Sequence, residues 1–198
     1  MRYDYAEILR QIQLDPRYQQ NLDWGKPRRG HPEGTIRAHI RQLEDNLEAL
    51  REKLTDVECW KLEILIHTHD TFKADAQLGI AISDPCSHAS LAREFLADHC
   101  DDLDLLNVVR YHDVPYSMWR RFTKKSESQR DRLEQLKSAI CDWNVFLAFL
   151  IVDGCTEGKS RRPLAWFFGQ ICGQVDTRFT ARDILGPGEQ IKNIDRDV

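Results

Sequence analysis

Apolar residues recur along this chain with the period of an α-helix. In the clearest stretch they follow one another in steps of four and three, at Ile36, Ile40, Leu43, Leu47, Leu50 and Leu54. That spacing places all of them on one face of a helix. Thr35 or Gly34 precedes the stretch and is suited to begin it. No stretch alternates apolar and polar residues with the period of a strand, so we predict an all-α fold.

Further helices are predicted in the same way. The segment from residue 56 to about residue 72 begins amphipathic and becomes apolar later, so its second half is expected to be buried. Ser87, and either Asp101 or Asp102, are suitable N-caps for two more helices. Pro115 suits the first turn of a short one. We also predict one long helix from about residue 128 to residue 153, and another from residue 164 to residue 172.

The size and charge of the chain are those of an ordinary globular domain. Its 198 residues are enough for one domain, which we predict over residues 1–198 with a core at about residues 31–175. The polar tail from about residue 186 is expected to be loosely held. The net charge of −4 argues against a nucleic-acid partner. The longest apolar run, residues 145–152, is far too short for a membrane span.

The cysteines and the first residues favour a cytoplasmic protein. The six cysteines are scattered without a C-x-x-C pair, so they match neither a zinc ribbon nor a disulfide framework. We expect most of them to be small core residues in a reducing cytosol. The first residues, MRYDYAEILRQ, contain no signal-peptide hydrophobic region.

Several titratable residues fall on the apolar faces of these helices. His39 lies three residues after Ile36, and His88 lies three residues before Leu91. Further along the chain, His112 and Asp153 follow apolar residues at the same helical spacing. His69 and Asp70 are adjacent at the end of an apolar run. Buried imidazoles and carboxylates need compensation, and a divalent cation is a common one. We therefore predict that these side chains point inward, toward a metal.

In this order the residues resemble the pattern of the HD-domain superfamily of metal-dependent phosphohydrolases, H…HD…H…H…D. The matching positions are His39, His69, Asp70, His88, His112 and Asp153, and the resemblance spans roughly residues 31–155. The stretch HDTFK also resembles the family's HD-x-x-K, with Lys73 in the lysine position. The segment GHPEGTIRAHI is similar to the entry of the first ligand helix in several members. The fold that the resemblance implies is an HD-domain helical bundle.

The resemblance also implies a role for each residue. His39, His69, Asp70 and Asp153 would hold one metal, and Asp70 would bridge to a second one held by His88 and His112. Two metals about 3.5–4 Å apart can share a hydroxide and clamp a phosphoryl group. Asp70 and Lys73 are accordingly the expected catalytic residues, with Lys73 neutralising charge on the phosphate. A solvated lysine at a helix end is an equally good interpretation of Lys73.

The function predicted from the resemblance is hydrolysis of a phosphate monoester or diester, perhaps of a nucleotide, by a metal-bound hydroxide. An oxygenase with a mixed-valent di-iron centre uses the same ligand set in some members of the superfamily. A non-enzymatic ligand sensor is the third alternative. One or two divalent ions are expected, and iron, manganese, cobalt, nickel, zinc and magnesium all suit these ligands. The oligomeric state stays open.

Residues near the predicted ligands have more than one interpretation. His31 and Glu33 precede the first ligand helix, where they would either line the mouth of the site or form a turn. Asp113 follows His112 and is suited to accept a hydrogen bond from a ligand. Tyr116 and Trp119 fit core packing better than a pocket wall.

The segment DGCTEGKS, residues 153–160, resembles a phosphate-binding loop at first sight. The motif needs G-x-x-x-x-G-K-[ST], and its first position is occupied by Asp153. We therefore reject this interpretation. The basic residues that follow, Lys159, Arg161 and Arg162, are expected either to bind a substrate phosphate or to form a solvated loop.

Overall fold

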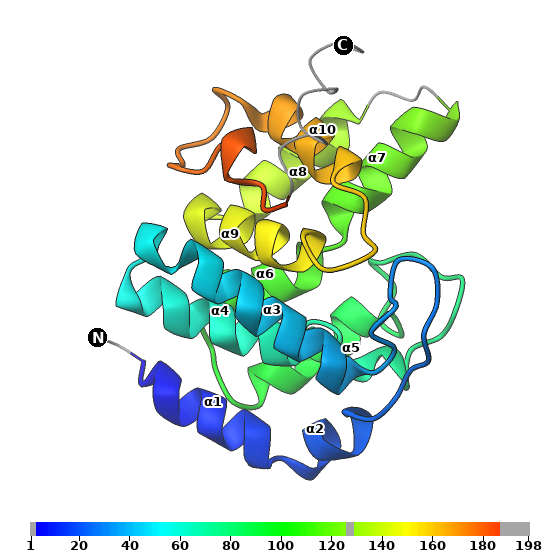
Figure 1. Ribbon diagram of the computed structural model, residues 1–198, viewed down its shortest axis with the longest axis vertical. Coiled ribbons are helices and arrows are strands. Elements are labelled where there is room, and N and C mark those ends of the chain that lie inside the picture. Colours follow the sequence, from blue (N-terminus) through cyan, green and yellow to red (C-terminus); the bar gives the residue numbers. More distant parts are fainter. Residues whose placement is uncertain (1–2, 126–128, 187–198) are drawn as a thin grey trace.

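The computed structural model describes residues 3–125 and 129–186, and these residues are helical with no β-strand among them (Figure 1). The all-α prediction is therefore confirmed. The α-helices are α1 Tyr5–Leu14, α2 Pro16–Asn21, α3 Ile36–Leu50, α4 Asp56–Thr68, α5 His88–Ala97, α6 Leu103–Tyr111, α7 Val114–Lys125, α8 Arg130–Ala139, α9 Trp143–Gly154 and α10 Arg162–Ile171. Short 3-10 helices are η1 Arg51–Lys53, η2 Thr71–Lys73 and η3 Ala181–Asp183. The predicted loose tail lies outside the described residues, apart from Gly186.

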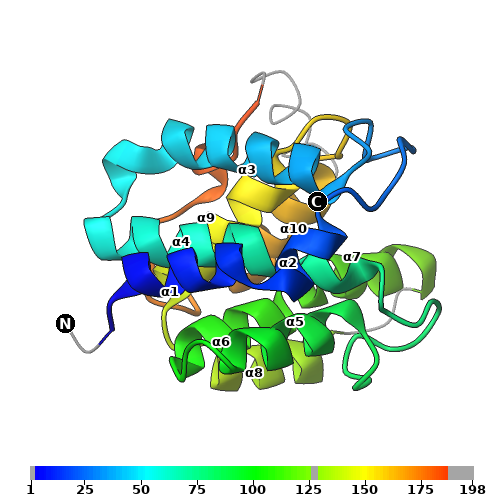
Figure 2. The same ribbon diagram turned by 90° about the horizontal axis from the view of Figure 1, so that it is seen from below.

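Helix α4 occupies the centre of the molecule. It contacts α1, α3, α5, α6 and α9, which surround it in both ribbon views (Figures 1 and 2). Its second half is buried all round, because Leu62, Ile64, Leu65 and Ile66 are almost inaccessible to solvent. A helix that is apolar on every face fits only such a position. The end of α4 therefore lies inside the protein.

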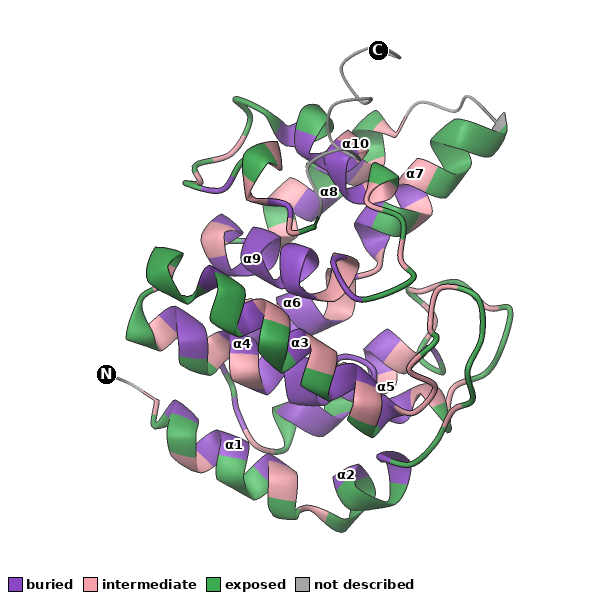
Figure 3. Ribbon diagram, viewed as in Figure 1, coloured by how far each residue is buried: buried purple, intermediate pink, exposed green. Residues whose placement is uncertain are grey.

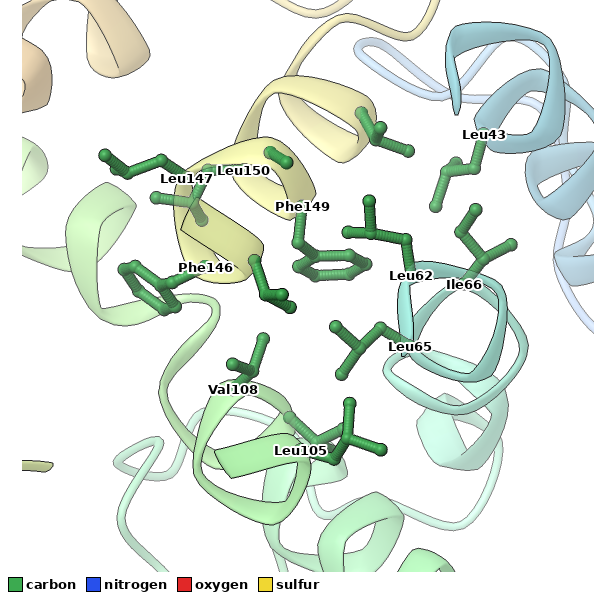
Figure 4. Packing of buried hydrophobic residues seen from close by; sticks show 14 of the residues in the cluster. Leu43, Leu62, Leu65, Ile66, Leu105, Val108, Phe146, Leu147, Phe149 and Leu150 are labelled. Carbon is green, nitrogen blue, oxygen red and sulfur yellow. The ribbon is translucent and has the colours of Figure 1, made fainter. Parts of the chain in front are cut away.

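Helix α9 provides the second element of the core. Every residue from Val145 to Val152 is buried, and the helix is correspondingly almost entirely in the buried colour (Figure 3). Phe149 lies between α4 and α9 near Leu62 and Leu65, and Phe146 lies on the side of α6, near Val108 (Figure 4). The buried hydrophobic residues of the described chain form one cluster. Because α3, α4 and α9 contact one another pairwise, polar residues at their ends are brought together.

The predicted helix starts are confirmed. The side chain of Thr35 accepts a hydrogen bond from the Ala38 amide, and that of Ser87 accepts one from the Ser90 amide. Asp102, rather than Asp101, caps α6. Pro115 lies in the first turn of α7, which begins one residue earlier.

The prediction of one helix over residues 128–153 is wrong. The chain breaks between α8 and α9, whose axes make an angle of 115°. Ile140 is extended at the break, and Asp142 begins α9 by accepting a hydrogen bond from the Val145 amide. An aspartate favours such a cap over a helix interior. Helices α1 and α2 were not predicted, although Asp4 and Asp15 cap them in the same way.

Two further expectations concern the cysteines and the membrane. Cys59, Cys100 and Cys155 are buried, whereas Cys86, Cys141 and Cys172 are exposed, so the expectation that most are core residues is wrong.

In the described part of the chain, no single helix is long and apolar enough to cross a bilayer; only α8 and α9 taken together meet that length and composition.

Glu58 links the start of α4 to the C-terminal part of the chain. Its Oε2 accepts hydrogen bonds from the amide and hydroxyl of Thr55, at 2.8 and 2.9 Å, and it forms an ion pair with Arg178. Burial by itself would raise the pKa of Glu58, but Arg178 and the Thr55 donors outweigh it and lower the pKa below 4.5. The folded protein therefore favours the ionised carboxylate.

We predict that Glu58→Gln lowers the free energy of unfolding at pH 7 by about 1–3 kcal/mol, because glutamine keeps the capping geometry but removes the charge. Since the folded pKa is the lower one, this contribution is complete above pH 4.5 and disappears as the pH falls through the folded value. Urea unfolding at pH 7 and pH 3 measures both effects. The exposed Glu48→Gln is the control, and an equal loss at both pH values would contradict the prediction.

Candidate metal centre

The centre is built around the end of α4. His69 is the C-cap residue of that helix, and Asp70 begins η2 immediately after it. Because α4 ends inside the protein, both side chains are buried, with residue exposures of 1 % and 5 %. The apolar run that places the helix in the core thus also places this pair there.

One group of ligand atoms comes from α3, α4 and α9. His39, His69 and Asp153 each offer an atom, and these atoms lie within 4.8 Å of one another. The Oδ1 atom of Asp153 is 3.1 Å from His39 Nε2 and 3.7 Å from His69 Nε2. We call this group the first triad. Its geometry follows from the mutual contacts of the three helices.

A second group lies beside the first. Asp70, His88 at the start of α5 and His112 at the end of α6 also offer atoms within 4.8 Å of one another. The ring centroids of His88 and His112 are 5.4 Å apart, and those of His112 and His69 are 5.3 Å apart. We call Asp70, His88 and His112 the second triad. All six residues singled out from the sequence are therefore brought together.

The two carboxylate oxygens of Asp70 point toward different histidines. One faces those of the first triad, and the other faces those of its own, second triad. Its Oδ2 atom is 3.4 Å from His69 Nε2 and 3.8 Å from His39 Nε2. Its Oδ1 atom is 3.7 Å from His88 Nε2 and 3.9 Å from His112 Nε2. A carboxylate in this arrangement has one oxygen available to each of two cations. The resemblance implies the same bridging position for Asp70.

Backbone carbonyl oxygens fix the orientation of two of the imidazole rings. His69 Nδ1 lies 3.1 Å from the carbonyl oxygen of Leu65, and His112 Nδ1 lies 2.7 Å from that of Val109. A carbonyl oxygen only accepts, so each Nδ1 must carry the hydrogen. In the neutral ring the lone pair is then on Nε2, which faces the triads. Hydrogen bonds of this kind orient histidine ligands in metal sites.

Two imidazole Nε2 atoms in the centre lack a hydrogen-bond partner. His69 Nε2 and His88 Nε2 are inaccessible to solvent and make no hydrogen bond with any described residue. Leaving a buried polar atom unsatisfied costs about 1–3 kcal/mol, so such atoms call for an explanation. A divalent cation between the histidines and carboxylates would satisfy both nitrogens. The donor set of imidazole nitrogens and carboxylate oxygens fits such an ion.

The protonation of the centre follows from its carboxylates. Burial by itself would lower the pKa of His69, but Asp70 and Asp153 outweigh it and raise the pKa to about 9. Burial would raise the pKa of both carboxyl groups, yet Lys73 holds that of Asp70, and Lys159 that of Asp153, well below the ordinary value. Both carboxylates are thus ionised, the form in which they bind cations.

Lys73 and Lys159 lie against these two carboxylates. Lys73 forms an ion pair with Asp70 and is mostly buried, so the interpretation of Lys73 as a solvated lysine is wrong. Lys159 Nζ donates to Asp153 Oδ1 at 2.7 Å and to the Asp153 carbonyl at 3.1 Å. Arg161 donates to carbonyl oxygens of the loop that follows α9, among them that of Cys155 at 2.6 Å. It is therefore a structural residue of that loop.

His31 and Glu33 adjoin the first triad. His31 Nδ1 donates to Glu33 Oε1 at 2.9 Å, and the same oxygen lies 3.0 Å from His39 Nδ1, although without the alignment of a hydrogen bond. His31 also pairs with Arg28 in an isolated β-bridge. His31 and Glu33 therefore form a turn and also lie beside the site, so both interpretations of these two residues apply.

The side chain of Asp113 lies beside the histidines of the second triad. Its Oδ2 atom is 3.3 Å from His88 Nε2, and its Oδ1 atom is 4.0 Å from His112 Nε2. The side chain therefore faces the metal-binding nitrogens rather than the outer nitrogen of a ligand ring. Its position directly after His112 was the only signal for it.

A cavity of about 810 Å³ opens beside the second triad. His88, Asp113 and Lys73 form part of its wall. A narrow gap lined by His39, Asp70 and again Lys73 lies next to it. The cavity gives a small molecule access to the metal-binding side chains. Most of its other wall residues were not singled out from the sequence, because they come from loops and from the exposed face of α7.

Comparison with protein-family models, with curated proteins and with solved structures gives no match to this chain.

We predict that the purified protein binds divalent metal at both triads. His39→Ala should cost one metal equivalent and His88→Ala the other, because they belong to different triads. Binding of manganese at 100 times its dissociation constant should stabilise the fold by about 2.7 kcal/mol, and a chelator should reverse this. Elemental analysis and thermal unfolding provide the measurements. His99→Ala, a half-buried histidine outside both triads, is the control. Loss of metal from this variant with none lost from His39→Ala or His88→Ala would refute the assignment.

Proposed function

We propose that the protein is a metal-dependent phosphohydrolase that acts on a phosphate ester of a small molecule. The observation that carries the proposal is the placement of Asp70, with one carboxylate oxygen toward each of two ligand triads. Two adjacent divalent cations activate water and neutralise charge on a phosphoryl group in many hydrolases. The resemblance to the HD-domain pattern supports the same chemistry.

The chain's own residues have distinct parts in this proposal. His39, His69 and Asp153 would hold one cation, His88 and His112 would hold another, and Asp70 would be a ligand of both. Backbone carbonyls accept hydrogen bonds from Nδ1 of His69 and His112 and so keep Nε2 of each ring directed at the triads. Lys73 lies at the junction of the cavity and the gap that reaches Asp70, where its ammonium group can pair with a phosphate oxygen.

The surroundings of the centre favour an anionic substrate. The cavity at the second triad carries more cationic than anionic side chains, although the chain as a whole has a net charge of −4. Local positive charge attracts and orients phosphorylated molecules. The same ligand set also serves di-iron oxygenases, so the test must distinguish hydrolysis from oxidation.

The test combines metal analysis with an assay of phosphate esters. Protein purified without added metal is analysed for its elements and then assayed with manganese or cobalt on a panel of phosphomonoesters and phosphodiesters. We expect hydrolysis that Asp70→Ala abolishes together with bound metal, because that substitution removes the shared ligand. Asp45→Ala, an exposed carboxylate on α3, should leave both unchanged.

Three results would overturn the proposal. Full activity in Asp70→Ala would show that hydrolysis does not use this centre. Consumption of dioxygen with iron, without hydrolysis in manganese or cobalt, would favour the oxygenase. A folded protein without metal or turnover under any of these conditions would favour the ligand sensor.

A further inference from the structure

The cavity beside the second triad is strongly cationic. Its wall contains five basic side chains and a single carboxylate, that of Asp113; the basic residues are Arg28, Lys73, Arg120, Arg121 and Lys124. Acidic residues outnumber basic ones in the whole chain, 32 to 28, so composition does not account for this excess. Such a local concentration of one charge raises the local concentration of ions of the opposite sign.

Four of these five cations have no carboxylate partner among the described residues. Lys73 is paired with Asp70. Within residues 3–125 and 129–186, by contrast, Arg28, Arg120, Arg121 and Lys124 have no acidic group within ion-pair distance. The guanidinium group of Arg120 instead lies 5.9 Å from the centre of the Tyr116 ring. Their charges are therefore available to a ligand.

Helix α7 presents three of these cations along one side of the cavity. Tyr116, Arg120 and Lys124 follow one another at steps of four, and Arg121 lines the cavity beside them. On the other faces, Met118 is buried, and the ring of Phe122 stacks on that of Trp166 in α10 at 5.3 Å. The cationic face thus lines the cavity. Tyr116 is 49 % exposed and lines the cavity, which corrects its assignment to the core.

The cations of α7 are well separated from the triads. Asp113, which faces His88, directly precedes the first residue of α7. With a rise of 1.5 Å per residue, the backbone of Arg120 lies about 9 Å along the helix from Val114, and that of Lys124 about 15 Å. An anionic group bound near Lys124 is therefore distinct from one that reacts at the triads, and Arg120 lies between these two positions.

Apolar side chains line the cavity between and opposite these charges. Leu78, Ile80 and Ile82 belong to the loop after η2, and Trp24 belongs to the loop before α3. Leu78 is 88 % exposed and Trp24 is 39 % exposed, so both are accessible to a ligand. The cavity therefore provides anion-binding groups and an apolar surface on which an organic skeleton can rest.

We propose that this cavity selects a small organic molecule that carries two separated phosphate groups. One phosphate lies at the triads, and the second pairs with Arg120, Arg121 and Lys124; arginine's planar group binds phosphate oxygens through two hydrogen bonds. The skeleton between the phosphates contacts the apolar wall. This inference names the substrate class for the proposed hydrolase and therefore rests on that function.

The test compares bisphosphates with their monophosphates in the manganese-loaded protein. The probes are fructose 1,6-bisphosphate with the two fructose monophosphates, and adenosine 3′,5′-bisphosphate with the two adenosine monophosphates. We expect at least a roughly 10-fold lower KM for a bisphosphate, because each charge-assisted contact of the second phosphate is worth about that factor or more. In the variant that combines Arg120→Ala, Arg121→Ala and Lys124→Ala, the KM for a bisphosphate should rise to that of the monophosphates.

A matched variant controls for the change in net charge. Arg10→Ala, Arg41→Ala and Arg51→Ala together remove the same charge from exposed positions that do not line the cavity. This variant should keep the preference. Equal KM values for bisphosphates and monophosphates in the unchanged protein, or equal effects of the two triple variants, would refute the inference and leave the hydrolase proposal standing.

A binding measurement separates the two proposals. Isothermal titration of the manganese-loaded protein with each bisphosphate and each monophosphate does not require turnover. Tighter binding of a bisphosphate that the cavity variant loses, without hydrolysis of any probe, would refute the function and support the recognition of two phosphates. Equal binding of both classes would refute the recognition, whatever the turnover.

Discussion

The carboxylate of Asp70 is buried at the end of the central helix, and the organisation of the site depends on this. A buried carboxylate is costly unless cations or hydrogen-bond donors surround it. Here His39, His69, His88, His112 and Lys73 surround it. Each of its oxygens faces a different pair of imidazole nitrogens. The four imidazoles come from four different places in the chain, so the packing of α3, α4, α5 and α6 is coupled to this one group.

The core and the centre have the same structural origin. Helices α4 and α9 are apolar on all sides over their buried stretches, which forces them into the interior. Their C-terminal ends then carry His69 and Asp153 into the protein, since Asp153 directly follows an apolar run and His69 comes three residues after Ile66, the end of another. The carbonyl oxygens of the last turns orient the rings of His69 and His112. The geometry of the candidate metal centre is thus a consequence of where buried helices end.

The cavity differs from the centre in its construction. Its wall combines two loops, at residues 22–35 and 74–87, with the exposed face of α7. These segments are far apart in the sequence, and each would be an ordinary surface segment alone. Their meeting beside His88 and Asp113 gives the centre a cavity lined by both cationic and apolar side chains.

The sequence by itself determined the fold class and the membership of the two triads. Helical periodicity and suitable caps predicted α3, α4, α5 and α6, because these signals are local. Histidines and aspartates at the positions of an apolar stripe were expected inside, and all six came together. The break between α8 and α9 was missed, because an apolar run continues through it and one aspartate cap was too weak a signal.

Only the tertiary structure decided which contacts these residues make and what surrounds them. No spacing in the chain states that Asp70 has one oxygen toward each triad, that Asp113 faces His88, or that Lys159 pairs with Asp153. Those contacts join residues on different helices and depend on packing angles rather than on periodicity. The cationic cavity is the clearest case. The basic side chains on the exposed face of α7 line a cavity only when the two loops are in place.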